Sequence, residues 1–170
     1  MRKDRVEEFD TPHEPKTKTA EQALNSLMRL CSKAEKSSGD ALRLMYRWGV
    51  PIAERQGVLD KLVEMRFIDD ARYAEAFVRD KLNLSGWGVY KIKSALRTKG
   101  VSKDIIDEVI APMIEATDMK ERLEDIMKRK LRTLKYSSTY DAKNKLIRFA
   151  ASRGYELDEA IECASKIVGE

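Results

Sequence analysis

Apolar residues recur along the chain at spacings of three and four, the pattern of a helix with one buried face. Three of these stripes end on a glycine flanked by an apolar or aromatic residue, and the glycines lie 51 and 54 residues apart: Trp48-Gly49-Val50, Lys99-Gly100-Val101 and Arg153-Gly154-Tyr155. An internal repeat of about 50 residues predicts stacked copies of one small unit. Each copy holds three stripes, so we expect an all-α, elongated, curved array of three three-helix, helix-turn-helix-like repeats without strands.

The predicted units span residues 19–68, 69–116 and 117–170. Residues 1–18 precede them with dense mixed charge and almost no apolar content, which predicts a flexible tail. Side chains that cap helix starts precede several stripes. These start signals are Thr19 with Gln22, Ser37 with Asp40, Asp69 or Asp70, Ser102 and Asp118.

The third helix of each unit carries the clearest predicted core positions. They are Leu59, Leu62, Val63 and Met65 in the first unit, Ile105, Ile106, Val109, Ile110 and Met113 in the second, and Leu157, Ala160, Ile161, Ala164 and Ile167 in the third. We expect the first helix of the third unit to span 118–134, and its second helix 139–153.

Composition excludes several classes of protein. Charged residues make up 36% of the chain and hydrophobic residues 42%, and no apolar run approaches the length of a membrane span. The charged N-terminus lacks the apolar segment of a secretory signal, so we expect a cytoplasmic protein without membrane contact.

The residues of common catalytic and metal sites are missing from the pattern. His13 is the single histidine, and Cys31 and Cys163 fall on apolar stripes, where free thiols behave as small hydrophobic groups. No phosphate-binding glycine loop or nucleophile motif is present. We therefore expect no metal, no cofactor and no enzymatic activity.

Positive charge is unevenly distributed although the net charge is only +4. Six basic residues face one acidic residue between Arg79 and Lys99, and eleven face five between Asp118 and Arg153, while 103–115 is acidic. Such segregation favours a polyanionic partner over an evenly solvated surface.

The second helix of the middle unit carries this charge opposite its apolar stripe. Tyr90, Lys93 and Arg97 share one face, with Lys91 and Lys99 beside them. Taken alone, this face is more typical of an ordinary solvated helix than of a binding surface. The equivalent helix of the third unit repeats the charge with Lys143, Lys145 and Arg148, whereas the first unit offers only Arg43 and Arg47. The recurrence predicts one aligned basic strip that neutralises phosphates.

Other basic and aromatic residues have plainer interpretations. The cluster from Lys128 to Arg132 distributes charge around its helix and forms i,i+4 pairs with acidic residues, which favours a structural role. Trp87 is expected to pack over a helix junction. Arg72 and Arg79 are expected to reach outward from the first helix of the middle unit.

The middle unit resembles the signature of the RecX family of bacterial recombination regulators over about residues 66–110. The matching residues are Asp70-Ala-Arg-Tyr-Ala74, Phe77-Val-Arg79, Gly86, Lys91-Ile92, Leu96 and Lys99-Gly100-Val101. The resemblance implies a modular helical protein that binds the RecA recombinase filament on single-stranded DNA. It implies lodging along the filament groove and inhibition of ATP hydrolysis, strand exchange and recombination in DNA repair and the SOS response.

The predicted contact set combines the resemblance with the charge pattern, and we expect a monomer to present it. It comprises Arg72, Arg79, Tyr90, Lys91, Lys93, Arg97, Lys99, Lys143, Lys145 and Arg148. Two alternatives remain open at the level of the sequence. One is a helix-turn-helix-like protein that reads duplex DNA, and the other is a protein-binding helical scaffold without nucleic-acid contact.

Overall fold

The structure, a computed structural model, describes residues 17–169, so residues 1–16 of the predicted tail and His13 lie outside the described part. The described residues form helices only, without a strand. The helices are α1 (Ala20–Cys31), α2 (Ser38–Arg47), α3 (Ile52–Glu64), α4 (Asp70–Asn83), α5 (Val89–Thr98), α6 (Lys103–Glu115), α7 (Met119–Leu131), α8 (Thr139–Arg153) and α9 (Leu157–Gly169).

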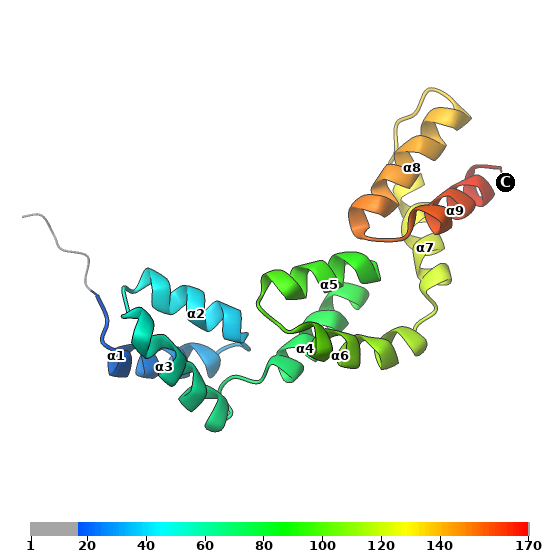
Figure 1. The fold of residues 1–170 in the computed structure, drawn as a ribbon. Coiled ribbons are helices and arrows are strands. Elements are labelled where there is room, and N and C mark those ends of the chain that lie inside the picture. Colours follow the sequence, from blue (N-terminus) through cyan, green and yellow to red (C-terminus); the bar gives the residue numbers. More distant parts are fainter. Residues whose placement is uncertain (1–16, 170) are drawn as a thin grey trace, which may run out of the picture.

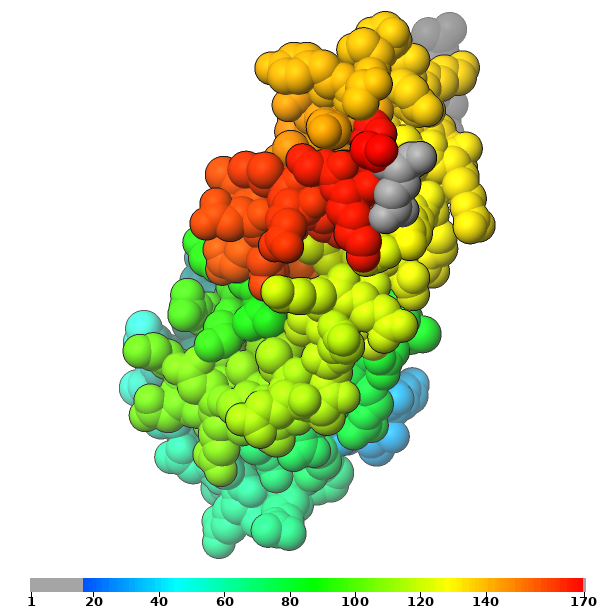
Figure 2. Space-filling view, turned by 90° about the vertical axis from the view of Figure 1, so that its right-hand side faces the viewer, coloured from blue at the N-terminus to red at the C-terminus, as the bar shows by residue number. Residues whose placement is uncertain are grey.

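The helices form a bent row of three-helix units, which confirms the predicted fold class (Figure 1). The second helices α2, α5 and α8 follow one another along the inner side of the bend, and we call them the inner row. The third helices α3, α6 and α9 lie toward the outer side, and we call them the outer row. Figure 2 shows the third unit extending beyond the second instead of folding back over it.

Each unit encloses its own hydrophobic cluster. The most deeply buried large side chains are Leu27, Met45, Leu62 and Ile68 in the first unit, Ile92, Leu96 and Ile106 in the second, and Leu123, Met127 and Leu146 in the third. A cluster built from about 50 residues supplies only marginal stability. Contacts between units therefore matter for both stability and shape.

The predicted helix starts are confirmed. Thr19 and Gln22 form a capping box, and the side chains of Ser37, Asp69, Ser102 and Asp118 each accept a hydrogen bond from a first-turn amide. The three repeat glycines Gly49, Gly100 and Gly154 have φ values of +66°, +79° and +87°. These left-handed conformations end each second helix, which is the role the repeat predicted.

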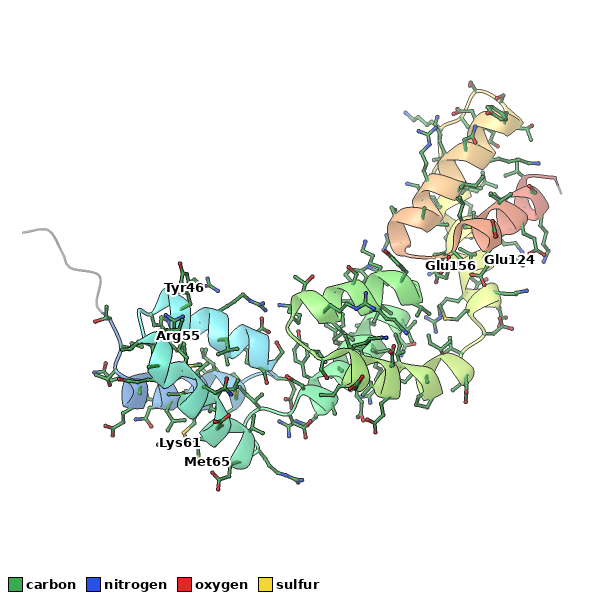
Figure 3. All side chains as sticks on the ribbon, viewed as in Figure 1. Tyr46, Arg55, Lys61, Met65, Glu124 and Glu156 are labelled. Atoms are coloured by element: carbon green, nitrogen blue, oxygen red, sulfur yellow. The ribbon has the colours of Figure 1, made fainter. Side chains whose placement is uncertain are left out.

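Several predicted core positions are wrong. Val63 and Met65 are 48% and 44% exposed, because α3 buries Val58, Leu59 and Leu62 and its last turn extends past the core. Figure 3 shows Met65 at this free end.

Two errors fall in the third unit. Leu157 and Ile161 are 56% and 43% exposed, since α9 buries only its Ala160, Ala164 and Ile167 face. Helix α7 ends at Leu131 instead of residue 134.

The first and second units meet end to end, with the N-terminus of α2 against the C-terminus of α5. Ser37 Oγ donates to the Lys99 carbonyl at 2.6 Å, and Arg43 Nη1 donates to the Thr98 carbonyl at 2.9 Å. Asp40 accepts from both Arg43 and Lys99. These donors satisfy carbonyls that a helix C-terminus leaves without partners.

The second and third units meet in the same way. The backbone amide of Gly88 donates to the Arg153 carbonyl at 2.7 Å, and Lys91 Nζ donates to the Ser152 carbonyl at 2.9 Å. Arg153 Nη1 reaches back to the Ser85 carbonyl at 2.6 Å.

The two joints use carbonyls at the same positions before the repeat glycine, although their donors differ: Ser37 uses its side chain and Gly88 its backbone amide. In each, the carbonyl one residue before the repeat glycine accepts from the N-cap residue of the preceding unit's second helix, and the carbonyl two residues before it accepts from a cation. The carbonyl before the first repeat glycine is also paired, because the amide of Lys18, the last residue before the first unit, donates to the Trp48 carbonyl at 2.8 Å. The positive end of one helix dipole thus meets the negative end of the next.

Close backbone approach at the joints requires glycine. A Cβ on Gly39 would lie 2.2 Å from the Lys99 carbonyl oxygen, and one on Gly88 would lie 2.3 Å from the Gly154 carbonyl oxygen. Because both neighbours are backbone atoms, neither side yields without moving a helix.

We expect Gly88→Ala to destabilise the protein by about 1–3 kcal/mol, the usual range for overpacking a tight contact. Gly57→Ala is the matched control, because a Cβ there meets nothing within 4 Å in the interior of α3 and should stabilise the helix by about 0.5–1 kcal/mol. Urea unfolding measures both. A Gly88→Ala protein with unchanged stability and an unchanged scattering profile would contradict the close backbone contact at this joint.

We expect Asp40 to make the first joint sensitive to acid. Partial burial alone raises the pKa of this carboxyl, but hydrogen bonds from Arg43 and Lys99 outweigh it and hold the pKa below its usual 3.8. The stabilisation is therefore complete above about pH 4 and is lost as the pH falls through the folded-state pKa.

Asp40→Asn should accordingly lower the free energy of unfolding at pH 7, and its difference from the wild type should shrink below pH 3.8. Glu108→Gln is the control, since this carboxylate forms no ion pair within residues 17–169. A difference that stays constant with pH would refute the linkage.

Candidate polyanion-binding surface

Charge is sorted by helix position within the repeat. The inner-row helices α2, α5 and α8 carry two, three and four basic residues against one, none and one acidic residue. The outer-row helices α3, α6 and α9 carry two, one and one basic residues against three, four and three acidic residues. The inner side of the bend is therefore cationic and the outer side anionic, which favours a polyanion on the inner side.

Some predicted contact residues on the inner row are available to a ligand. Tyr90 is 71% exposed at the start of α5, and Arg97 and Arg148 are exposed on α5 and α8. Lys143 is half-buried on α8. Within residues 17–169, none of these four side chains forms a hydrogen bond or ion pair.

Other predicted contact residues already have partners within the protein. Lys93 pairs with Asp107 of α6 at 2.6 Å, and Lys145 pairs with Asp141 at 2.8 Å. Each hydrogen bond lowers the pKa of its carboxyl. These lysines keep a stabilising role whether or not a ligand is present.

Lys91 and Lys99 lie at the joints. Lys91 holds the Ser152 carbonyl and also covers the Trp87 ring, with its Nζ 4.6 Å from the ring centroid. Lys99 pairs with Asp40 at 3.2 Å. Trp87 itself packs edge-on against Phe77 and is half-buried, as its predicted role over a helix junction requires.

The two arginines predicted on α4 lie apart from the inner row. Arg72 forms an ion pair with Glu35 of the first unit at 2.7 Å. It therefore stabilises the first joint, whereas the sequence pattern predicts that it reaches outward. Arg79 is exposed on α4 beside Glu75 and Glu108. The structure therefore does not bring all ten predicted residues together.

Sequence reasoning missed two aromatic residues of the inner row. Tyr46 on α2 and Tyr140 on α8 are 70% and 76% exposed. With Tyr90 on α5, each of the three second helices therefore carries one exposed tyrosine. Figure 3 shows Tyr46 on the inner side of the bend, and Arg55 lies over its ring at 5.2 Å. The signal available in the sequence was a tyrosine off the apolar stripe in every second helix.

Other kinds of site are not formed by the described residues. Among residues 17–169, no group of three His, Cys, Asp or Glu side chains is placed to hold a metal ion. No described helix is both long and apolar enough to cross a membrane. Cys31 and Cys163 are half-buried free thiols, and burial raises the pKa of each.

Known proteins share this sequence and arrangement. A family model for the second three-helix domain of RecX matches residues 69–110, and a model for the third three-helix domain of RecX matches residues 117–163. The regulatory protein RecX of Mycolicibacterium vanbaalenii is 31% identical over 152 residues, covering 86% of this chain and 82% of that protein. The chain belongs to the RecX family.

Further RecX proteins agree with this assignment. The regulatory protein RecX of Clostridium botulinum strain Alaska E43 is 38% identical over 143 residues, and the match covers 83% of this chain but 64% of the clostridial protein. The chain thus spans less than two thirds of that relative. The crystal structure of RecX from Lactobacillus salivarius matches with a TM-score of 0.71 at 19% identity, covering 87% of this chain and 96% of that one. This likeness concerns the RecX fold.

We expect stability to separate free from structural cations on α8. Arg148→Gln should change the free energy of unfolding by less than about 0.5 kcal/mol, as exposed substitutions usually do. Arg153→Gln removes the bond to Ser85 and should cost about 1.5–3 kcal/mol, the range for a charged hydrogen bond. Both variants lose one charge from the same helix, so equal losses in urea unfolding would contradict the distinction.

Proposed function

We propose that this RecX-family protein regulates RecA by binding the RecA filament on single-stranded DNA with its inner row. The observation that carries the proposal is the sorting of charge across the bend, with basic second helices inside and acidic third helices outside. A filament is long, repetitive and rich in phosphate, so it suits a long cationic surface better than a compact ligand does.

Exposed side chains along the inner row provide two complementary kinds of contact. Arg97 and Arg148 neutralise phosphates without first breaking an internal ion pair. Tyr46, Tyr90 and Tyr140 offer exposed rings that pack against protein or stack on unpaired bases. Contacts spread over three units bridge successive filament subunits and hinder the motions needed for ATP hydrolysis and strand exchange.

The duplex-reading alternative has less support. A helix-turn-helix reader places its recognition helix in the major groove, between two lines of phosphates. In the middle unit that helix is α6, whose Asp104, Asp107, Glu108 and Glu115 face a single Lys103. Repulsion between these carboxylates and the phosphates opposes insertion.

The test is the rate of ATP hydrolysis by RecA on single-stranded DNA with added protein. We expect the wild type to slow turnover, and Arg97→Glu with Arg148→Glu to raise the concentration for half-inhibition by about tenfold or more. Unchanged turnover at saturating wild-type protein would overturn the regulatory role.

Lys61→Glu with Lys103→Glu is the matched control, because it makes the same change in net charge on the outer row. We expect it to weaken inhibition less than twofold. Equal weakening by both double variants would show that net charge, and not the inner row, governs binding. Co-sedimentation with filaments, bare DNA and RecA alone would then separate the scaffold alternative from DNA binding.

A further inference from the structure

A second concentration of positive charge lies at the joint between the second and third units. A cleft of about 390 Å³ opens there between the α4–α5 loop, α7 and the last turn of α8. Arg122, Arg129, Lys130 and Arg153 line it, and no carboxylate does. Its volume falls in the range of small-molecule sites.

The hydrogen bonds of these cations leave their charge uncancelled. Arg122 donates to the Leu82 carbonyl and to Asn83 Oδ1, and Arg153 donates to the Ser85 carbonyl. All three acceptors are neutral, so they orient the guanidinium groups without neutralising them.

The other two cations, Arg129 and Lys130, also have uncharged partners. Arg129 Nε donates to the Asp125 backbone carbonyl at 3.3 Å, and Lys130 Nζ lies 5.5 Å from the centroid of Phe149. Within residues 17–169, none of the four forms an ion pair. The carboxylates of Asp118, Glu121 and Asp125 line a neighbouring hollow, which Arg122 and Arg129 also border, and they do not line this cleft.

The positive charges of Arg122 and Arg153 also act on a buried hydroxyl, that of Tyr155. The Tyr155 hydroxyl has no hydrogen-bond partner among the described residues. Burial raises the pKa of Tyr155, while the nearby charges of Arg122 and Arg153 act to lower it. Both guanidinium groups therefore act on the protein interior as well as on the cleft.

We propose that this cleft is a phosphate-binding site. Guanidinium groups present donors in a planar fork that matches phosphate oxygens, and two of the three here are already held in place by the 82–85 segment. Four cations without an acidic neighbour in the lining favour a ligand with more charge than one carboxylate. The exposed Leu84 provides an apolar part of the lining for the group that carries the phosphate, whereas the Phe149 ring lies beneath Lys130 and Arg153.

The site goes beyond the proposed function, because it requires neither RecA nor the inner row. Its phosphate has two sources, a free mononucleotide or the backbone of a single strand. Titrating the full chain with thymidine monophosphate and with an eight-nucleotide thymidine strand, observed through the amide signals of Ser85 and Gly86, distinguishes them. Saturable shifts with the mononucleotide assign a nucleotide site, and shifts with the strand alone assign a backbone site.

The variant Arg129→Gln with Lys130→Gln tests the assignment without touching the two arginines that hold the loop. We expect it to weaken binding of the effective ligand at least tenfold and to reduce the salt slope for the strand by about 1.4. Lys120→Gln with Arg132→Gln is the control, because Lys120 lies in α7 and Arg132 is its C-cap, and neither residue lines the cleft. The control thus removes the same number of charges as the test variant. We expect this control to change affinity less than threefold.

Three results would overturn the proposal. They are the absence of shifts at Ser85 and Gly86 with either ligand, equal weakening by both double variants, and equally tight binding of an oligoglutamate peptide of matched charge. Inhibition of RecA by the wild type would survive each of these results. Conversely, phosphate binding in the cleft with no effect on RecA turnover would leave the site standing and remove the proposed function.

Discussion

The end-to-end docking of second helices is the contact on which the shape of this protein depends. Each unit has its own apolar cluster, and the joints between units are built from backbone carbonyls, N-cap donors and cations. Such contacts are directional, whereas apolar burial is not. Carbonyls at the same two positions are used at both joints, but the donors differ, and the row turns more sharply between the second and third units than between the first and second (Figure 1). Gly39 and Gly88 allow this approach because they present no side chain to the facing backbone.

This docking also determines where charge accumulates. Placing α2, α5 and α8 in one row brings their basic residues to the inner side of the bend, and it moves the acidic third helices outward (Figure 1). Some of the inner-row cations hold the joints and others remain exposed. The surface that meets a polyanion and the contacts that maintain the bend are therefore built from neighbouring residues. Salt should act on both, most strongly on the exposed charges.

The joints have a second consequence on the α4 and α7 side. Arg122 and Arg153 reach across from the third unit to carbonyls of the 82–85 segment, which gathers their charge with that of Arg129 and Lys130 around one cleft. The sequence pattern of the cluster from Lys128 to Arg132 favours a structural role. Lys128 does pair with Glu124, whose pKa is held at about 2 by hydrogen bonds from Lys128 and Lys166. Arg129 and Lys130, the next two residues of the cluster, instead line the cleft, because their side of α7 faces the second unit.

The sequence by itself determined the helices, their caps, the repeat glycines and the family, because these depend on local patterns that a single chain displays. Val63 and Ile161 are exposed although the sequence pattern predicts that they are buried. An apolar residue at the edge of a stripe is buried only where another element covers it. The basic second helices were also visible in the sequence. Only the tertiary structure decided which cations hold carbonyls or carboxylates and which face solvent. Lys91 and Arg97 lie on the same helix, yet one holds Ser152 of the next unit while the other faces solvent. That difference depends on contacts 61 residues apart, which local spacing does not encode.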